Sequence, residues 1–224
     1  GFRECPEMIE LSIDNNPKNK KWVIFGFDAM YMIGDFDGRT FIPNHDQEKK
    51  YKLHYGNFQA SQCFSRAPKN IQIGWVPVEL PGMSFNQLFS LPLELSLRNT
   101  LQGVRLCAEP ITEIESLRDF CQNINNYQTS ETIKFSTEGQ LFDVLVDVDI
   151  LNATELILKF GLNEMRYNVG TRELDGIYVP PRNNSLKFRV IIDKPIYEIF
   201  VESGIICNIQ KRIDAGKNIN LIEL

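Results

Sequence analysis

The chain has 224 residues, of which 43% are hydrophobic and 11% aromatic, and its formal net charge is −5 at pH 7. This length and composition predict a globular protein with one large or two ordinary domains. No long basic stripe and no run of ~20 apolar residues is present, so we expect neither a nucleic-acid partner nor a membrane span.

The first residues have the composition of a strand interior, which suggests a fragment or a split gene product, and no export signal is recognisable there. The compartment therefore stays open. An extracellular or periplasmic location would follow if the full-length protein carried an export signal.

Short segments rich in β-branched and aromatic residues, separated by Gly, Asn, Asp or Pro, predict an all-β protein. In chain order these segments are residues 20–27, 31–42, 70–78, 93–99, 103–109, 141–150, 156–162, 186–193, 196–209 and 218–224.

Two of these segments alternate with a period of two, and one contains a turn signal. In residues 144–150, Val or Ile occupies every second position and Asp147 and Asp149 point the other way, and residues 186–190 alternate apolar residues with Lys187 and Arg189. Both segments are predicted to be strands with one buried and one solvent-facing side. The sequence DFDGRT predicts a hairpin turn at Gly38, in which the aspartates form the turn rather than bind a ligand.

One segment has helical spacing instead. In PITEIESLRDFCQ, Thr112 precedes Glu115 by three residues, and apolar residues recur at helical intervals over residues 111–121. This is a capping box that opens a short amphipathic helix, which we expect to divide the chain into two parts.

The cysteines and histidines indicate no metal centre. The five cysteines are Cys5, Cys63, Cys107, Cys121 and Cys207. They are widely spaced, odd in number and without a C-x-x-C pair, so we expect mostly buried free thiols. Two histidines, His45 and His54, are too few for a histidine-rich metal site.

Six stretches together resemble glycoside hydrolase family 32, the invertases, levanases and inulinases that cleave β-fructosides. They are ECPE (4–7), YMIGDFDGRTFIP (31–43), YGNFQASQCFS (55–65), IQIGWVPVELPGMSFNQLFSLPLELSLR (71–98), VRLCAEPITEIESLR (104–118) and YEIFVESG (197–204). They occur in the order seen in that family and cover nearly the whole chain.

The resemblance implies a fold and a domain organisation. Family members join a five-bladed β-propeller to a C-terminal β-sandwich through a short helical linker. Residues 1–110 would then be the last blades of the propeller, residues 111–121 the linker, and residues 122–224 the sandwich. The chain is thus similar to the C-terminal half of such an enzyme.

The resemblance also assigns catalytic chemistry. Retaining glycosidases use two carboxyl groups roughly 5 Å apart, one as nucleophile and one as acid/base. By resemblance Glu4 is the acid/base. The family's nucleophile and a second substrate-binding aspartate lie in Asp-Pro motifs, and this sequence contains no Asp-Pro dipeptide. We therefore expect the isolated chain to be inactive. This chemistry needs no metal and no organic cofactor.

Four further residues are expected by resemblance to bind substrate, and two of them depart from the family pattern. His54 stands before Tyr55 and Gly56 where an aspartate is common, and Asn57 stands where some members have a lysine. Trp75 matches an aromatic residue of the family's cleft, although a core tryptophan is the alternative. The departures put the usual substrate, or activity itself, in question.

Two functional interpretations are open. The first is a portion of a β-fructosidase that acts on fructan, sucrose or another β-fructoside. The second is a non-catalytic remnant that binds a fructan or another protein chain. An unrelated all-β binding protein would require the motif order to be coincidental. Because an incomplete propeller exposes strand edges and inter-blade surface, we also expect self-association or a partner chain that completes it.

Overall fold

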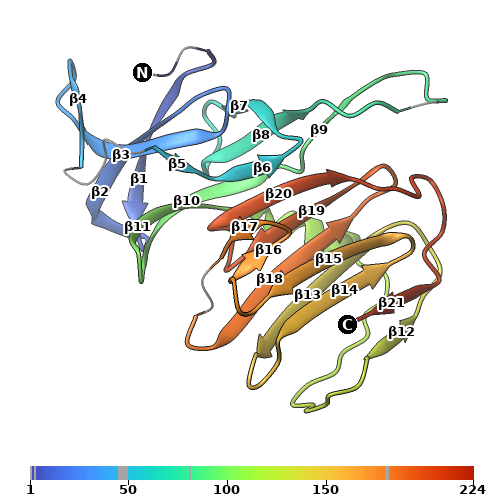
Figure 1. Ribbon diagram of the computed structural model, residues 1–224. Helices are drawn as coiled ribbons and strands as arrows, with labels where there is room; N and C mark the ends of the chain where they lie inside the picture. The colour runs from blue at the N-terminus through green and yellow to red at the C-terminus, as the bar shows by residue number, and fades with distance from the viewer. Residues whose placement is uncertain (1, 3, 45–49, 81, 180–181) are drawn as a thin grey trace. The chain divides into compact units, whose positions relative to one another are not determined.

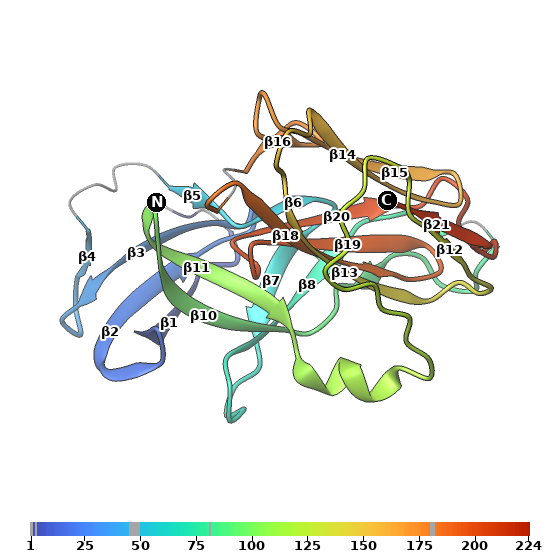
Figure 2. The same cartoon turned by 90° about the horizontal axis from the view of Figure 1, so that it is seen from below.

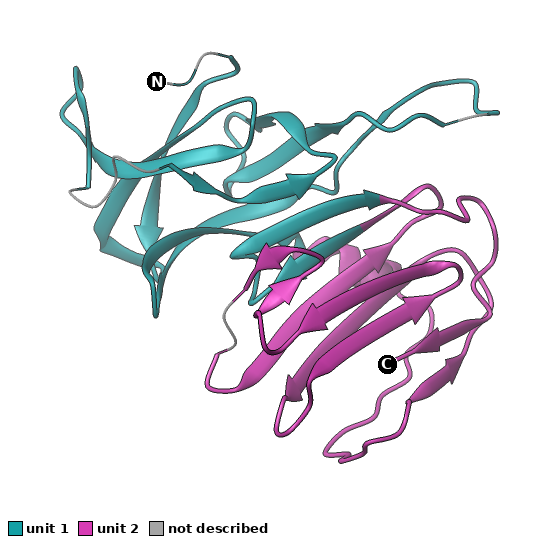
Figure 3. Ribbon diagram, viewed as in Figure 1, with its two compact units in different colours: residues 1–111, 198–210 teal, residues 112–197, 211–224 magenta. Residues whose placement is uncertain are grey.

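The computed structural model describes residues 2, 4–44, 50–80, 82–179 and 182–224 (Figure 1). The chain divides into two compact units (Figure 3). Unit 1 comprises residues 1–111 and 198–210, and unit 2 comprises residues 112–197 and 211–224. The regular elements of the described residues are strands apart from one short helix, η1 (Thr112–Leu117), which confirms the predicted all-β class. None of the helical segments described is long and apolar enough to span a membrane.

Unit 1 is built on a ten-stranded sheet with the order β4-β3-β2-β1-β10-β8-β7, to which β11, β5 and β9 are added by pairing with β10, β3 and β8. Its strands are β1 (Glu7–Ile13), β2 (Asn16–Phe25), β3 (Met30–Phe36), β4 (Phe41–Pro43), β5 (Tyr51–Lys52), β7 (Gln59–Cys63), β8 (Ile71–Val76), β9 (Leu88–Phe89), β10 (Leu93–Thr100) and β11 (Gly103–Pro110). In Figure 2, β10 and β11 form one long curved hairpin.

A further strand pair in unit 1 joins residues far apart in the sequence. Strand β6 (His54–Gly56) pairs in parallel with β20 (Ile206–Lys211), with His54 opposite Cys207 and Gly56 opposite Ile209. Strand β6 contains two of the predicted site residues, His54 and Tyr55, and Asn57 directly follows it. The segment 198–210 therefore supports the part of unit 1 on which the predicted site depends.

The core of unit 1 lies on one face of its first strands. Val23, Phe25, Tyr31 and Ile33 alternate along β2 and β3 and are each at most 2% exposed. The intervening side chains on these strands, such as Ile24, are only half-buried. The period of two thus separates a core face from a more open apolar face.

The predicted hairpin turn at Gly38 is confirmed. It joins β3 and β4, and Gly38 adopts a φ of +94°, in the left-handed region where glycine is favoured. The Asp37 carboxylate accepts hydrogen bonds from the backbone N–H groups of Arg39 and Thr40, at 2.8 and 2.7 Å. This aspartate is a turn former, as predicted.

Unit 2 contains a six-stranded sheet with the order β12-β21-β14-β15-β16-β17, and its strands β13 and β18 pair antiparallel as part of a five-stranded sheet. Its strands are β12 (Lys134–Ser136), β13 (Phe142–Asp149), β14 (Glu155–Phe160), β15 (Asn163–Asn168), β16 (Glu173–Leu174), β17 (Ile177–Tyr178), β18 (Ser185–Ile192) and β21 (Leu221–Glu223). Strand β19 (Ile196–Val201) crosses the boundary between the two units.

The predicted alternation in β13 and β18 is confirmed. Val146 and Ile150 are buried, whereas Asp147 and Asp149 are exposed. In β18, the apolar side chains at positions 186, 188 and 190 are at most 2% exposed, and Lys187 between them is exposed. The two strands pair over eight residues, so their apolar faces lie on the same side.

The helix predicted over residues 111–121 is shorter than expected. Only Thr112–Leu117 is helical, with 3-10 geometry, and none of its residues is buried (Figure 2). An isolated amphipathic stripe with no surface to pack against gains little from α-helical geometry, so a single tight turn suffices. The segment is held by Arg118, which donates a hydrogen bond to the Asp143 carboxylate at 2.8 Å.

The five cysteines are free thiols, as predicted, but they are not mostly buried. Cys107 and Cys207 are buried and Cys63 is half-buried, whereas Cys5 and Cys121 are exposed. Spacing in the sequence does not rank their burial, because the burial of each thiol depends on what packs against its segment in the folded chain.

Candidate functional site

The segment that carries Glu4 is fixed by backbone hydrogen bonds although the Glu4 side chain is exposed. The Glu4 carbonyl oxygen accepts a hydrogen bond from Phe27 N–H at 3.0 Å, and the Phe27 carbonyl oxygen accepts one from Ala60 N–H at 3.1 Å. Glu4 is therefore two backbone hydrogen bonds away from the start of β7.

A second anchor acts three residues further along the chain. The half-buried Glu7 accepts a hydrogen bond on Oε2 from Cys63 N–H at 2.8 Å, at the end of β7. Burial, together with the adjacent Glu7 charge, raises the pKa of the Cys63 thiol to about 12. The ECPE segment is thus bonded directly to the end of β7 and, through Phe27, to its start. The raised pKa keeps the Cys63 thiol protonated near neutral pH.

Trp75 lies in a row of side chains that crosses three strands. It is opposite Gln59 of β7 and opposite Phe89 of β9. Residues directly opposite each other in antiparallel strands share one face of the sheet. Trp75 is half-buried, and its Nε1 donates a hydrogen bond to Gln87 Oε1 at 2.6 Å. It is therefore not a fully buried core tryptophan.

His54 is buried, with 2% of its surface exposed. Its ring stacks on Phe58 at a centroid distance of 3.6 Å, and its Nε2 lies 3.0 Å from Gln72 Oε1. Gln72 Nε2 in turn donates to Ser61 Oγ at 2.9 Å. Because Gln72 Oε1 can only accept, this arrangement places the imidazole proton on Nε2. The geometry gives His54 a structural role, and its contact with substrate stays a prediction.

The burial of His54 makes unit 1 sensitive to acid. Burial lowers the pKa of the imidazole to about 3, an effect that the Gln72 hydrogen bond only partly opposes. An unfolded chain binds this proton near pH 6.5. The neutral ring therefore contributes stability above pH 6.5 that is lost as the pH falls toward 3, by about 1 kcal/mol per pH unit.

We expect His54→Gln to reduce the loss of stability on acidification. The measurement is the slope of the unfolding free energy against pH between pH 6 and pH 4. His45→Gln, which changes the other histidine in the sequence, is the matched control. Proton NMR should show the His54 ring still neutral at pH 5 in the folded protein. Titration of the folded protein's His54 near pH 6.5 would contradict its burial.

Tyr55 and Asn57 lie beside His54 but are held differently. Tyr55 is half-buried and follows His54 on β6, so its side chain points to the opposite face of the strand. Burial raises its pKa. Asn57 donates to the Ile209 carbonyl oxygen from its backbone N–H at 2.8 Å and from Nδ2 at 3.3 Å. Two of the five predicted site residues, His54 and Tyr55, therefore point to opposite faces of β6.

Two further carboxylates belong to the segments that this hydrogen bonding joins, Glu7 in ECPE itself and Asp28 next to Phe27, and both accept hydrogen bonds from the backbone. Glu7 accepts from Cys63 N–H, and Asp28, one residue after Phe27, accepts on Oδ1 from Met30 N–H at 3.2 Å. No group of three or more His, Cys, Asp and Glu residues suited to a metal is found in the described part of the chain. The arrangement offers an acid/base candidate without an assigned nucleophile.

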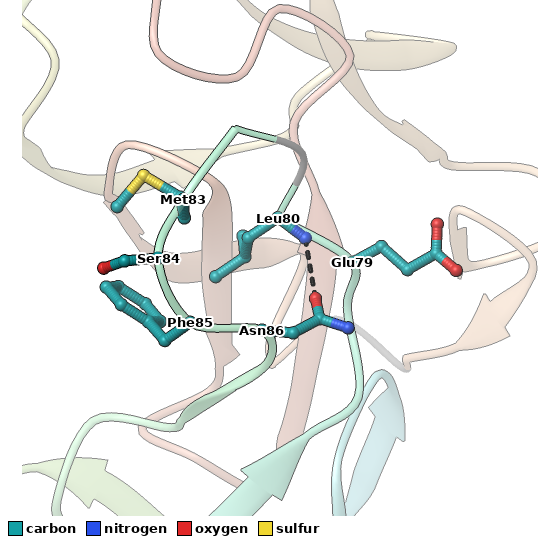
Figure 4. A pocket seen from close by; sticks show the side chains of 6 residues that line it. All are labelled: Glu79, Leu80, Met83, Ser84, Phe85 and Asn86. Carbon is teal, nitrogen blue, oxygen red and sulfur yellow. Dashed lines mark hydrogen bonds between the residues drawn. The ribbon is translucent and has the colours of Figure 1, made fainter.

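A surface hollow of about 440 Å³ lies on the loop between β8 and β9, which follows Trp75 in the sequence. Its lining is Glu79, Leu80, Met83, Ser84, Phe85 and Asn86. In Figure 4 the Glu79 carboxylate points away from Met83 and Phe85, and Asn86 Oδ1 accepts the Leu80 N–H at 3.0 Å. This open hollow with a single carboxylate contains none of the predicted site residues.

Glu198 is a buried acid of unit 1 that the sequence patterns did not single out. Glu198 is 2% exposed, and its Oε1 accepts a hydrogen bond from Leu91 N–H at 2.8 Å. Every residue of β19, in which it lies, is buried. The sequence does contain an indication of this burial: Glu198 is the only carboxylate in a strand of otherwise apolar and aromatic residues. Such a group needs a hydrogen-bond partner inside the protein when it is buried.

Comparisons with known proteins agree on one family. Residues 1–110 match the family model described as "Glycosyl hydrolases family 32 N-terminal domain". Levanase from Bacillus subtilis (strain 168) is 24% identical over 91% of this chain and 38% of its own length. Extracellular exo-inulinase from Meyerozyma guilliermondii is 37% identical over 81 residues, which are 31% of this chain and 15% of that protein.

Solved structures share the fold. Exo-inulinase from Aspergillus awamori matches with a TM-score of 0.74 and 17% identity, over 98% of this chain and 56% of that one. A fructofuranosidase from Schwanniomyces occidentalis complexed with fructosylnystose matches with a TM-score of 0.71 and 18% identity, over 98% of this chain and 55% of that one. The chain thus spans little more than half the length of these structures, and 38% of the levanase.

Proposed function

Because the chain is a member of glycoside hydrolase family 32, we propose that it serves in the hydrolysis of β-fructosides such as levan, inulin or sucrose. Relatives named levanase, exo-inulinase and invertase support this substrate class. The single observation that carries the proposal is the way the ECPE segment is held: Cys63 at the end of β7 donates to Glu7, and Phe27, which accepts from Ala60 of β7, donates to Glu4.

Glu4 is the acid/base in this proposal. It first donates its proton to the oxygen that links the fructosyl unit to the leaving sugar, and it later removes a proton from the water that releases fructose. Both steps require the carboxyl group to come within hydrogen-bond reach of the reacting oxygen, and the hydrogen-bonded backbone restricts the positions from which the side chain can do so. Tyr55, Asn57, Trp75 and, less directly, His54 would contribute to substrate binding.

The nucleophile is the part that this sequence does not supply. Without an Asp-Pro motif, no fructosyl intermediate forms on these 224 residues alone. We therefore propose that the isolated chain binds β-fructosides but does not hydrolyse them. In this proposal residues 1–110 are the last blades of a β-propeller, residues 111–121 a linker and residues 122–224 a β-sandwich.

A second candidate function is that of a binding or interaction protein without catalysis. It is favoured by the more open apolar face of β1–β3, where Met8, Ile24 and Met32 are opposite one another and all half-buried. A surface of this kind suits a second protein chain or self-association. Light scattering of the purified chain tests it, since a monomer over a wide concentration range would count against it.

The proposed function is tested by transferring the chain into an active relative. We would replace the aligned segment of Bacillus subtilis levanase with residues 1–224 and measure fructose release from levan, inulin and sucrose. Glu4→Gln in this chimera is expected to lower release by about 10²–10⁴-fold, because the proton donor is lost. The control is Glu10→Gln, which alters a surface glutamate of β1 paired with Lys20 at 2.9 Å.

The isolated chain gives the complementary result. We expect no release from any of the three sugars, with or without Glu4→Gln. Release that Glu4→Gln abolishes would show that another carboxylate replaces the missing aspartate. An active chimera that tolerates Glu4→Gln would overturn the role of Glu4.

A further inference from the structure

The row of side chains that contains Trp75 continues onto an exposed aromatic ring. Phe89, directly opposite Trp75 on β9, is 69% exposed. Gln59 is opposite Trp75 on its other side, and Gln87 accepts the indole N–H at 2.6 Å. Two aromatic side chains on neighbouring strands are thus bordered by two side-chain amides.

The chemistry of this row selects its partner. None of its four residues is charged, so an ionic ligand finds no counter-charge there. A sugar ring presents an apolar face, which packs on an aromatic ring, and a rim of hydroxyl groups, which hydrogen-bond to amides. A second copy of this chain is a poorer fit, because each copy carries a net charge of −5.

We propose that Trp75 and Phe89 form a stacking platform for two successive sugar rings of a neutral oligosaccharide, with Gln59 and Gln87 as hydrogen-bonding groups at its edges. Neighbouring strands lie about 4.8 Å apart, so the two aromatic side chains engage adjacent rings rather than one. Phe89 then determines specificity, because it favours a ligand with at least two sugar units over a monosaccharide.

The platform is continuous with the ECPE segment. Gln59 directly precedes Ala60, which donates to the Phe27 carbonyl, and Phe27 in turn donates to the Glu4 carbonyl. An oligosaccharide on the platform therefore lies on strands that are hydrogen-bonded to the segment carrying the acid/base. The inference rests on the proposed function only for the class of sugar, and it requires no catalysis.

The experiment uses the intact chain and its own fluorescence. Trp22 and Trp75 are the two tryptophans of the sequence, so Trp22→Phe leaves Trp75 as the sole reporter. Titration with a fructo-oligosaccharide such as nystose should change this emission to saturation. We expect fructose to bind at least about tenfold more weakly. Phe89→Ala should weaken nystose binding about tenfold and leave fructose binding unchanged.

The matched control is Phe64→Ala, which removes another exposed phenylalanine, 54% accessible, just after β7. It should leave both affinities unchanged. Equal affinity for nystose and fructose, or equal effects of the two phenylalanine substitutions, would overturn the platform. A loss of self-association in Phe89→Ala with sugar binding intact would show a protein interface instead.

The outcomes separate this inference from the proposed function. If nystose does not bind the isolated chain but the levanase chimera is active and depends on Glu4, the platform is wrong and the proposed function stands. If nystose binds through Phe89 but the chimera tolerates Glu4→Gln, the platform stands and the catalytic proposal fails.

Discussion

Gly204→Ala is expected to lower the free energy of unfolding by at least ~3 kcal/mol. Gly204 has a φ of +82°, and a Cβ atom there would lie 2.0 Å from the carbonyl oxygen of Ala108 and 2.9 Å from its nitrogen. Both contacts are with backbone, so no side-chain rotation relieves them. The Gly204 carbonyl also accepts the Ala108 N–H at 2.9 Å, which fixes this close approach.

The destabilisation caused by Gly204→Ala should extend to the candidate site. The turn at Gly204 leads into β20, which pairs with β6 and supplies the Ile209 carbonyl that holds Asn57. Hydrogen exchange of the backbone N–H groups of β6 should therefore accelerate in Gly204→Ala, together with the drop in the denaturation midpoint.

Gly38→Ala is the matched control for this prediction. Gly38 also lies in unit 1 and has a φ of +94°, but a Cβ atom there would meet no atom within 4 Å. Gly38→Ala should therefore lower the free energy of unfolding by only about 1 kcal/mol, the penalty of a left-handed backbone conformation alone. Equal losses in the two variants would show that the contact with Ala108 does not matter.

Asp214→Ala is expected to destabilise unit 2 by about 3–5 kcal/mol. Arg212 is 1% exposed and Asp214 is 5% exposed, and their side chains form an ion pair at 3.2 Å. The carboxylate also accepts hydrogen bonds from Leu162 N–H at 2.9 Å and Asn163 Nδ2 at 2.6 Å. Removing it leaves a buried guanidinium without a counter-charge and the Leu162 N–H without its acceptor, while Asn163 Nδ2 keeps only the Phe160 carbonyl oxygen.

Acid should weaken the same network. Burial opposes ionisation of Asp214, but the hydrogen bonds from Leu162 and Asn163 and the charge of Arg212 outweigh it, so its pKa lies below the ordinary value. A lowered folded-state pKa contributes stability above the unfolded-state pKa near 4, which is lost as the pH falls through the folded value. In Asp214→Ala, the fall in unfolding free energy between neutral pH and the acidic range should therefore be smaller by the contribution of this carboxyl group.

Glu164→Ala provides the control on the surface of unit 2. Its ion pair with Arg166 spans 2.7 Å, but the two side chains are 39% and 46% exposed. Solvated pairs of this kind contribute at most about 1 kcal/mol. Chemical denaturation of both variants should separate them clearly, and a cost for Asp214→Ala as small as that for Glu164→Ala would show that Arg212 is satisfied by backbone carbonyls alone.

Local patterns in the sequence determined much of the architecture. The alternation in β13 and β18 predicted their buried faces, and the DFDG turn predicted both the hairpin and the φ of Gly38. These features depend on residues within one strand or one turn, so they can be inferred without knowing what packs against them. The ordered motifs likewise sufficed to predict the family, because their identity and order are properties of the sequence.

The tertiary structure alone decided how the site residues are placed. Periodicity assigns two faces to a strand but does not say which face is buried against which partner, so the burial of His54 and the exposure of Phe89 did not follow from the sequence. The pairing of β6 with β20 joins residues more than 150 positions apart. Such a contact is specified by the shape of the assembled core rather than by local preference, and it determines which groups stand beside His54, Tyr55 and Asn57.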